Sequence, residues 1–105
     1  MISRRAFGAA CVLLLATGSL CSAEVRFSGG DGSSFGKAVI IQGVRNEREG
    51  VAAEYAWLGR NYTGWKLKLQ SQVGKKRRSY DIMDISNGSK SVSVYFDITS
   101  FFGKF

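Results

Sequence analysis

The chain has no histidine and no proline among its 105 residues, and its two cysteines both lie within the first 23. Histidine supplies the imidazole of most acid–base catalysts and is the commonest metal ligand, so both classes of site are disfavoured. Thiol chemistry and disulfides are confined to the N-terminal segment. Only carboxylates and other oxygen ligands remain for catalysis or metal binding. We therefore expect no enzyme activity, no cofactor and no metal site.

The first 23 residues have the three parts of an export signal. Residues 1–5 include Arg4 and Arg5, residues 7–20 form an apolar run, and residues 21–23 have small side chains where signal peptidase cuts. We therefore expect cleavage after Ala23. The apolar run is shorter than the ~20 residues of a membrane-spanning helix, so we expect no transmembrane segment after cleavage.

The start of this signal, Ser3-Arg4-Arg5-Ala6-Phe7, resembles the twin-arginine export motif. The next two positions, which are usually Leu and Lys in that motif, are Gly8 and Ala9 here. An ordinary Sec signal is the alternative. Either route implies a periplasmic or secreted bacterial protein.

Positive charge is the main compositional feature of the rest of the chain. The full sequence has 15 Lys and Arg against 8 Asp and Glu, and removal of Arg4 and Arg5 leaves a net charge of +5. Such an excess on a small domain favours an anionic partner, such as an envelope surface, another anionic macromolecule or an acidic protein. The composition does not choose among these, and it does not set the oligomeric state.

Residues 37–105 predict a single α+β domain behind a flexible leader, residues 24–36, that is rich in glycine and serine. Residues 37–42 predict a strand that is apolar on both faces. Asn46 predicts the N-cap of a helix, with Glu49 at the third helical position, and residues 61–64 its end. The predicted apolar stripe of this helix consists of Val51, Tyr55, Leu58 and Tyr62.

Three further strands are predicted after the helix. In the first, Trp65, Leu67, Leu69 and Val73 alternate with Lys66, Lys68, Gln70 and Gln72. Residues 80–85 form the second, and Asn87-Gly88 predicts a type I′ turn into the third. In the third strand, Val92, Val94, Phe96 and Ile98 point inward. We therefore expect one helix packed on an antiparallel sheet of about four strands, in the order β-α-β-β-β.

This order of elements resembles the cystatin-like fold, in which a helix lies across a curved antiparallel sheet. Cystatins that inhibit papain-type proteases use a Gln-x-Val-x-Gly hairpin, and Gln70-Ser71-Gln72-Val73-Gly74 is similar to it. Gly29-Gly30 corresponds to their N-terminal glycine, whereas their Pro-Trp hairpin has no counterpart because the chain has no proline. The resemblance implies protease inhibition through the segment 70–74 as an alternative function.

The strongest candidate site is a cluster of cations. Lys75-Lys76-Arg77-Arg78 is predicted to occupy a hairpin, and Lys66 and Lys68 the strand that leads to it. Six cations together would attract an anionic partner. The run lacks the interleaved aromatic residues of a stacking platform, which disfavours nucleic acid. A solvated turn that protects the sheet edge is the competing interpretation.

Two other features have open interpretations. Trp57 lies away from the predicted stripe, and it either anchors a partner or packs under the leader. Asp81 and Asp97, on neighbouring strands, could approach the separation of a carboxylate pair in a hydrolase, or they could pair with lysines across the strands. The predictions thus rank a basic binding module first, a protease inhibitor second and a hydrolase last.

Overall fold

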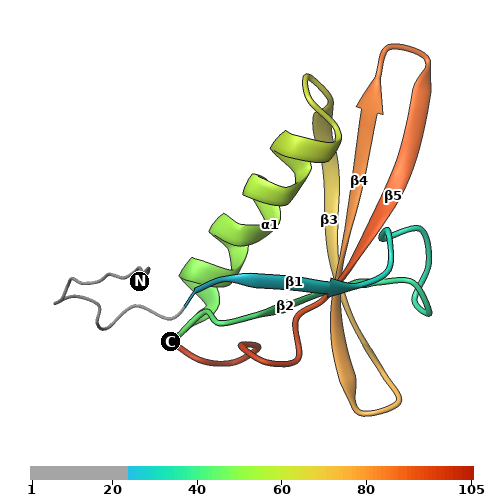
Figure 1. The fold of residues 1–105 in the computed structure, drawn as a ribbon. Coiled ribbons are helices and arrows are strands. Elements are labelled where there is room, and N and C mark those ends of the chain that lie inside the picture. The colour runs from blue at the N-terminus through green and yellow to red at the C-terminus, as the bar shows by residue number, and fades with distance from the viewer. Residues whose placement is uncertain (1–23) are drawn as a thin grey trace, which may run out of the picture.

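The structure, a computed structural model, describes residues 24–105, which form one helix and five strands. The predicted export signal, residues 1–23, lies outside the described residues. The elements in chain order are β1 (Arg26–Gly29), β2 (Val39–Gln42), α1 (Glu47–Asn61), β3 (Lys66–Lys75), β4 (Arg78–Asn87) and β5 (Lys90–Asp97). The strands form one mixed sheet in the order β1-β2-β5-β4-β3, with α1 on one face (Figure 1). The α+β class is confirmed.

The predicted strand count and order are wrong, because the leader contains a strand. β1 pairs antiparallel with β2, and the glycine-rich residues form the loop between them. Gly30 N–H donates to the Ala38 carbonyl at 3.1 Å, and Gly32 N–H donates to that of Lys37 at 2.7 Å. β2 in turn pairs parallel with β5, so the sheet is mixed rather than antiparallel. Phe27 packs against the core, which gives this short strand a reason to form.

The predicted N-cap of the helix is confirmed. The Asn46 side chain accepts a hydrogen bond from the Glu49 N–H at 3.0 Å, which satisfies one of the unpaired donors of the first turn. Glu49 does not reach back to Asn46. Its carboxylate accepts from the N–H of Arg45 at 2.9 Å and pairs with the Arg45 guanidinium at 2.5 Å. The helix ends at Asn61, within the predicted range.

The buried face of α1 differs from the predicted stripe. Its buried residues are Gly50, Ala53, Glu54 and Leu58. Tyr55, which the stripe places inside, is 48% exposed. Phe101, from the C-terminal segment, packs directly on Gly50. The small residues on this face let a large ring approach the helix. A prediction based on large apolar residues therefore does not identify the buried face.

A β-bulge reverses the faces of β3. The register with β4 shifts between Leu67 and Leu69, so Leu67 faces α1 while Leu69 faces away and is 58% exposed. Beyond the bulge, Gln70 and Gln72 lie opposite Met83 and Asp81 on the helix side of the sheet. The predicted alternation placed these glutamines on the face opposite to Leu67. One inserted residue is enough for the reversal, because side chains alternate with a period of two.

The second hairpin forms where it was predicted, with a different turn. Asn87 pairs with Lys90, so the two loop residues are Gly88 and Ser89. Only Gly88 of these has a positive φ, 64°, which fits a type II′ turn rather than the predicted type I′.

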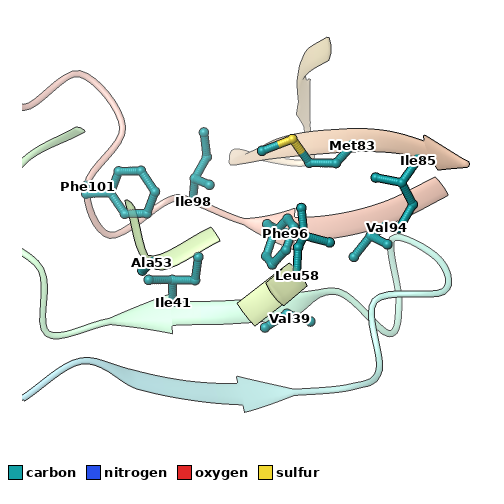
Figure 2. Packing of buried hydrophobic residues seen from close by; sticks show 10 residues of the cluster. All are labelled: Val39, Ile41, Ala53, Leu58, Met83, Ile85, Val94, Phe96, Ile98 and Phe101. Atoms are coloured by element: carbon teal, nitrogen blue, oxygen red, sulfur yellow. The ribbon is translucent and has the colours of Figure 1, made fainter. Parts of the chain in front are cut away.

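The core lies between α1 and the sheet, and Figure 2 shows ten of its side chains. The predicted inward positions Val94, Phe96 and Ile98 of the last strand are confirmed, whereas Val92 is 36% exposed. The C-terminal segment adds Phe101 to the core and leaves Phe102 and Phe105 exposed. The core members are Val39, Ile41, Ala53, Leu58, Met83, Ile85, Val94, Phe96, Ile98 and Phe101.

Candidate functional site

The β3–β4 hairpin ends in a two-residue loop made of two cations. Lys75 pairs with Arg78, which leaves Lys76 and Arg77 as the loop residues. Their φ angles are 51° and 67°, the left-handed values that a type I′ turn requires at both positions. Lys75, Lys76 and Arg77 are all exposed, and we call these three residues the basic tip. The hairpin extends away from α1 (Figure 1).

Arg78 directly follows the loop and lies opposite Lys75, but its charge is paired within the domain. Its Nε donates to Asp97 Oδ2 at 2.5 Å. The other oxygen of Asp97 accepts from the N–H and hydroxyl of Thr99, at 3.0 and 2.6 Å, and that hydroxyl accepts from the Ser79 N–H. Burial alone would raise the pKa of Asp97, but the hydrogen bonds from Arg78 and Thr99 outweigh it and lower the pKa. Asp97 is therefore a structural anion that fixes the hairpin.

An aromatic cluster supports the tip from the loop before β2. The Phe35 ring contacts Tyr80 and Tyr95 edge-on, with centroids 5.0 and 4.9 Å apart. The Lys75 ammonium lies 4.3 Å from the centre of the Phe35 ring, a cation–π distance. Sequence reasoning missed Phe35, since it lies 40 residues before Lys75 and nothing local indicates the contact.

The six predicted cations do not gather at one place. Lys66 and Lys68 lie near the start of β3, and Lys75 is its last residue. Lys75 lies seven residues after Lys68 along the strand, a distance of about 23 Å at the usual rise per residue. Lys66 and Lys68 thus form a separate exposed pair at the far end of the strand.

Trp57 packs inward. Its ring meets Phe96 of the core perpendicularly, with centroids 5.5 Å apart, and it also contacts Tyr62. It lies against the core cluster. Through Tyr62 it is connected to Trp65, the residue just before β3.

The segment Gln70–Gly74 lies inside β3 and is paired with β4 along its length. The hairpin turn comes two residues later, at Lys76-Arg77, so the segment does not form the loop that the cystatin resemblance implies. The Gln70 amide donates to Asp81 Oδ2 at 3.3 Å.

Asp81 and Asp97 lie on opposite faces of the sheet. Asp81 is directly opposite Phe96 and shares its helix-facing side, whereas the next residue, Asp97, points the other way. Two carboxylates on opposite faces cannot act on one bond, so the predicted pair is not assembled. In residues 24–105 no group of three acidic, histidine or cysteine side chains is placed to hold a metal ion.

Asp81 instead meets a second carboxyl group from the helix. Glu54 of α1 is 0% exposed and Asp81 is 1% exposed. Both Glu54 oxygens and Asp81 Oδ1 lack any hydrogen-bond donor among the described residues. Burial, together with the nearby Asp81, raises the pKa of Glu54 to about 10, so Glu54 is neutral at pH 7. Sequence reasoning missed Glu54; its spacing of four from both Gly50 and Leu58 is the signal that places it on the buried face.

Protein-family models, curated proteins and solved structures gave no match to the chain. The cystatin resemblance therefore stays a prediction. No helix within residues 24–105 has the length and apolar character needed to cross a membrane.

Proposed function

We propose that this protein is a small exported binding module, without enzymatic activity, that engages an anionic partner through the basic tip. The observation that supports it most is the conformation of Lys76 and Arg77. A non-glycine residue in the left-handed region costs roughly 1 kcal/mol or more, and two occur here in succession. Asn-Gly would form the same turn without this cost. Backbone strain of this kind is typical of functional positions, and here it presents two cations.

The charge of the tip is not neutralised within the domain. The two ion pairs of residues 24–105 are Arg45–Glu49 and Arg78–Asp97, and neither includes a residue of the tip. Burial also keeps Glu54 neutral, so the described residues carry more positive charge at pH 7 than their composition indicates. Three exposed cations on a projecting turn are well placed to attract an anionic surface.

The loop end of the hairpin is held in one conformation by contacts with the rest of the domain. Arg78, Asp97 and Thr99 connect β4 to the end of β5, and Phe35 supports Lys75. A fixed turn loses less entropy on binding than a flexible lysine-rich loop would lose. The support on both sides therefore favours a binding role over a merely solvated turn.

The test is a double substitution that removes charge and relieves strain together. Lys76→Asn with Arg77→Gly should weaken binding of a fluorescent heparin dodecasaccharide, used as the polyanion probe, by about tenfold at low salt. The same variant should raise the free energy of unfolding by about 1–2 kcal/mol, because both left-handed positions become favourable. Fluorescence anisotropy and urea titration measure the two effects, so loss of binding cannot be attributed to unfolding.

The matched control is Lys66→Ser with Lys68→Ser, which removes the same charge at the other end of β3. It should leave binding nearly unchanged. Equal weakening by both double variants would mean that net charge alone attracts the polyanion, and the proposed site would be wrong. Binding by the native protein should also weaken steeply between 50 and 200 mM salt.

A further inference from the structure

A groove separates α1 from the edge strand β1, on the same side of the sheet as the core. Its volume is about 710 Å³. The floor is apolar and is formed by Val25 and Phe27 from the strand side and by Ala52, Ala53 and Ala56 from the helix. Glu24, Gly43, Arg45, Glu49 and Arg60 complete the lining. The proposed function uses none of these residues.

The strand that borders the groove has an unpaired edge. β1 is the first strand in the sheet order, so only β2 pairs with it. Gly30 N–H bonds to the Ala38 carbonyl, and the register then makes Ser28–Ile40 and Arg26–Gln42 the hydrogen-bonded pairs. The N–H and C=O groups of Phe27 and Gly29 therefore point away from the sheet. They are available to another extended chain.

The helix side of the groove is lined by small residues. Ala52 and Ala56 are one turn apart on α1 and both are exposed. Between Glu49 and Arg60, α1 presents only alanines to the groove. Val25, on the strand side, is 42% exposed. The groove thus has room for apolar side chains from a bound segment.

The charges differ between the two ends. Glu49 and Arg45 are bound to each other at 2.5 Å at the N-terminal end of α1. At the other end the Arg60 guanidinium lies over the Phe27 ring, 5.4 Å from its centre, and no acidic residue of 24–105 forms an ion pair with it. A bound segment with a carboxylate at this end would complement Arg60.

We propose that this groove binds an extended peptide segment of a partner protein, which pairs with the free edge of β1. Alternate apolar side chains of the segment pack on Ala52 and Ala56, and an acidic side chain meets Arg60. Strand addition to a sheet edge beside a helix supplies both affinity, from backbone hydrogen bonds, and specificity, from alternate side chains. An acyl chain would fill the apolar floor but leave the donors and acceptors of β1 unused.

The opposite edge of the sheet is protected against such pairing. β3 carries Lys66, Lys68 and Lys75, and its bulge interrupts the register. Lysines and bulges at an edge disfavour the addition of a strand. β1 has neither device on its groove side, which makes it the edge open to a peptide.

The probe is the peptide acetyl-Thr-Val-Thr-Val-Thr-Asp-amide, in which both valines and the aspartate share one face of a strand. On binding to the purified protein, amide NMR signals of Phe27 and Gly29 should shift. Two further peptides carry N-methyl groups, one on both valines and the other on the second and third threonines. In an extended peptide, the N–H groups of the valines point to one edge and those of the threonines to the other. Only one edge can pair with β1, so one methylated peptide should lose binding and the other should keep it.

Two pairs of variants locate the groove. Ala56→Leu, which fills the groove with a good helix former, should weaken peptide binding at least tenfold. Tyr55→Leu, its neighbour on another side of α1, should leave binding unchanged. Arg60→Gln should weaken binding several-fold, and Arg48→Gln, outside the groove, should not.

Three outcomes would overturn the proposal. Equal binding of both methylated peptides would indicate an apolar ligand rather than a strand. Concentration-dependent dimerisation that Ala56→Leu abolishes would make a second copy the occupant. Absence of shifts at Phe27 and Gly29 would exclude the edge. The basic tip remains intact in all these variants, so failure here is distinct from failure of polyanion binding.

Discussion

Replacing Gly50 by alanine should destabilise the protein by about 1–3 kcal/mol, although alanine is the better helix former. A Cβ at this position would lie 2.2–2.5 Å from three ring atoms of Phe101. The Phe101 ring is 1% exposed, and its backbone N–H is bonded to the Ile98 carbonyl, so it has little room to move. The clash therefore outweighs the gain of about 1 kcal/mol in helix propensity.

Gly59→Ala is the matched control, because it makes the same change in the same helix. A Cβ at Gly59 meets nothing within 4 Å. This variant should gain about 0.5–1 kcal/mol, so the two substitutions should have opposite signs. Urea unfolding measures both. If Gly50→Ala were as stable as Gly59→Ala, Phe101 would not pack on the helix as the structure has it.

The second large effect is on the pH dependence of the free energy of unfolding, and it comes from Glu54. Its pKa is raised to about 10 in the folded protein and returns to an ordinary value near 4.5 on unfolding. The folded state therefore binds more protons between these two values, and the free energy of unfolding falls as pH rises through this window. The contribution of Glu54 to stability is complete below pH 4.5 and is lost by about pH 10.

Glu54→Gln should remove this dependence. The amide cannot ionise, and its N–H₂ group can donate to Asp81 Oδ1, which lacks a donor. At pH 8 the variant should be more stable than the native protein by roughly 2–4 kcal/mol, and at pH 4 the difference should nearly vanish. Thermal or urea unfolding across pH 4–9 measures both slopes.

Glu24→Gln is the control for this experiment. Glu24 is an exposed acid, and its replacement should leave the pH profile of stability unchanged. If Glu54→Gln kept the native slope, Glu54 would not be the buried proton-binding group. Asp81→Asn should reduce the slope only in part, because burial, the largest cause of the raised pKa of Glu54, remains.

Features that depend on a few neighbouring residues could be predicted. Asn46 caps α1 because its side chain reaches an N–H group three residues later. The hairpin at Gly88 forms because glycine adopts a positive φ without strain. The alternation of Val94, Phe96 and Ile98 identifies β5, because one face of that strand meets the core and the pattern has a period of two.

Other features depend on contacts between segments far apart in the chain. The sequence of β1 is typical of a flexible leader, and the segment is a strand because it pairs with β2. The sheet is mixed because β2 pairs parallel with β5. A bulge of one residue moves Gln70 to the helix side, and no local pattern marks that position.

The amino-acid sequence alone determined the charge, the absence of imidazole, the helix cap and the position of the second hairpin, because each depends on residue type or on close neighbours. Only the tertiary structure decided which cations share a surface and which carboxyl groups meet. It separated Lys68 from Lys75 along one strand and turned Asp97 away from Asp81. It also brought Glu54 of α1 close to Asp81 of β4. Burial and proximity depend on how these elements pack, and they are far apart in the sequence.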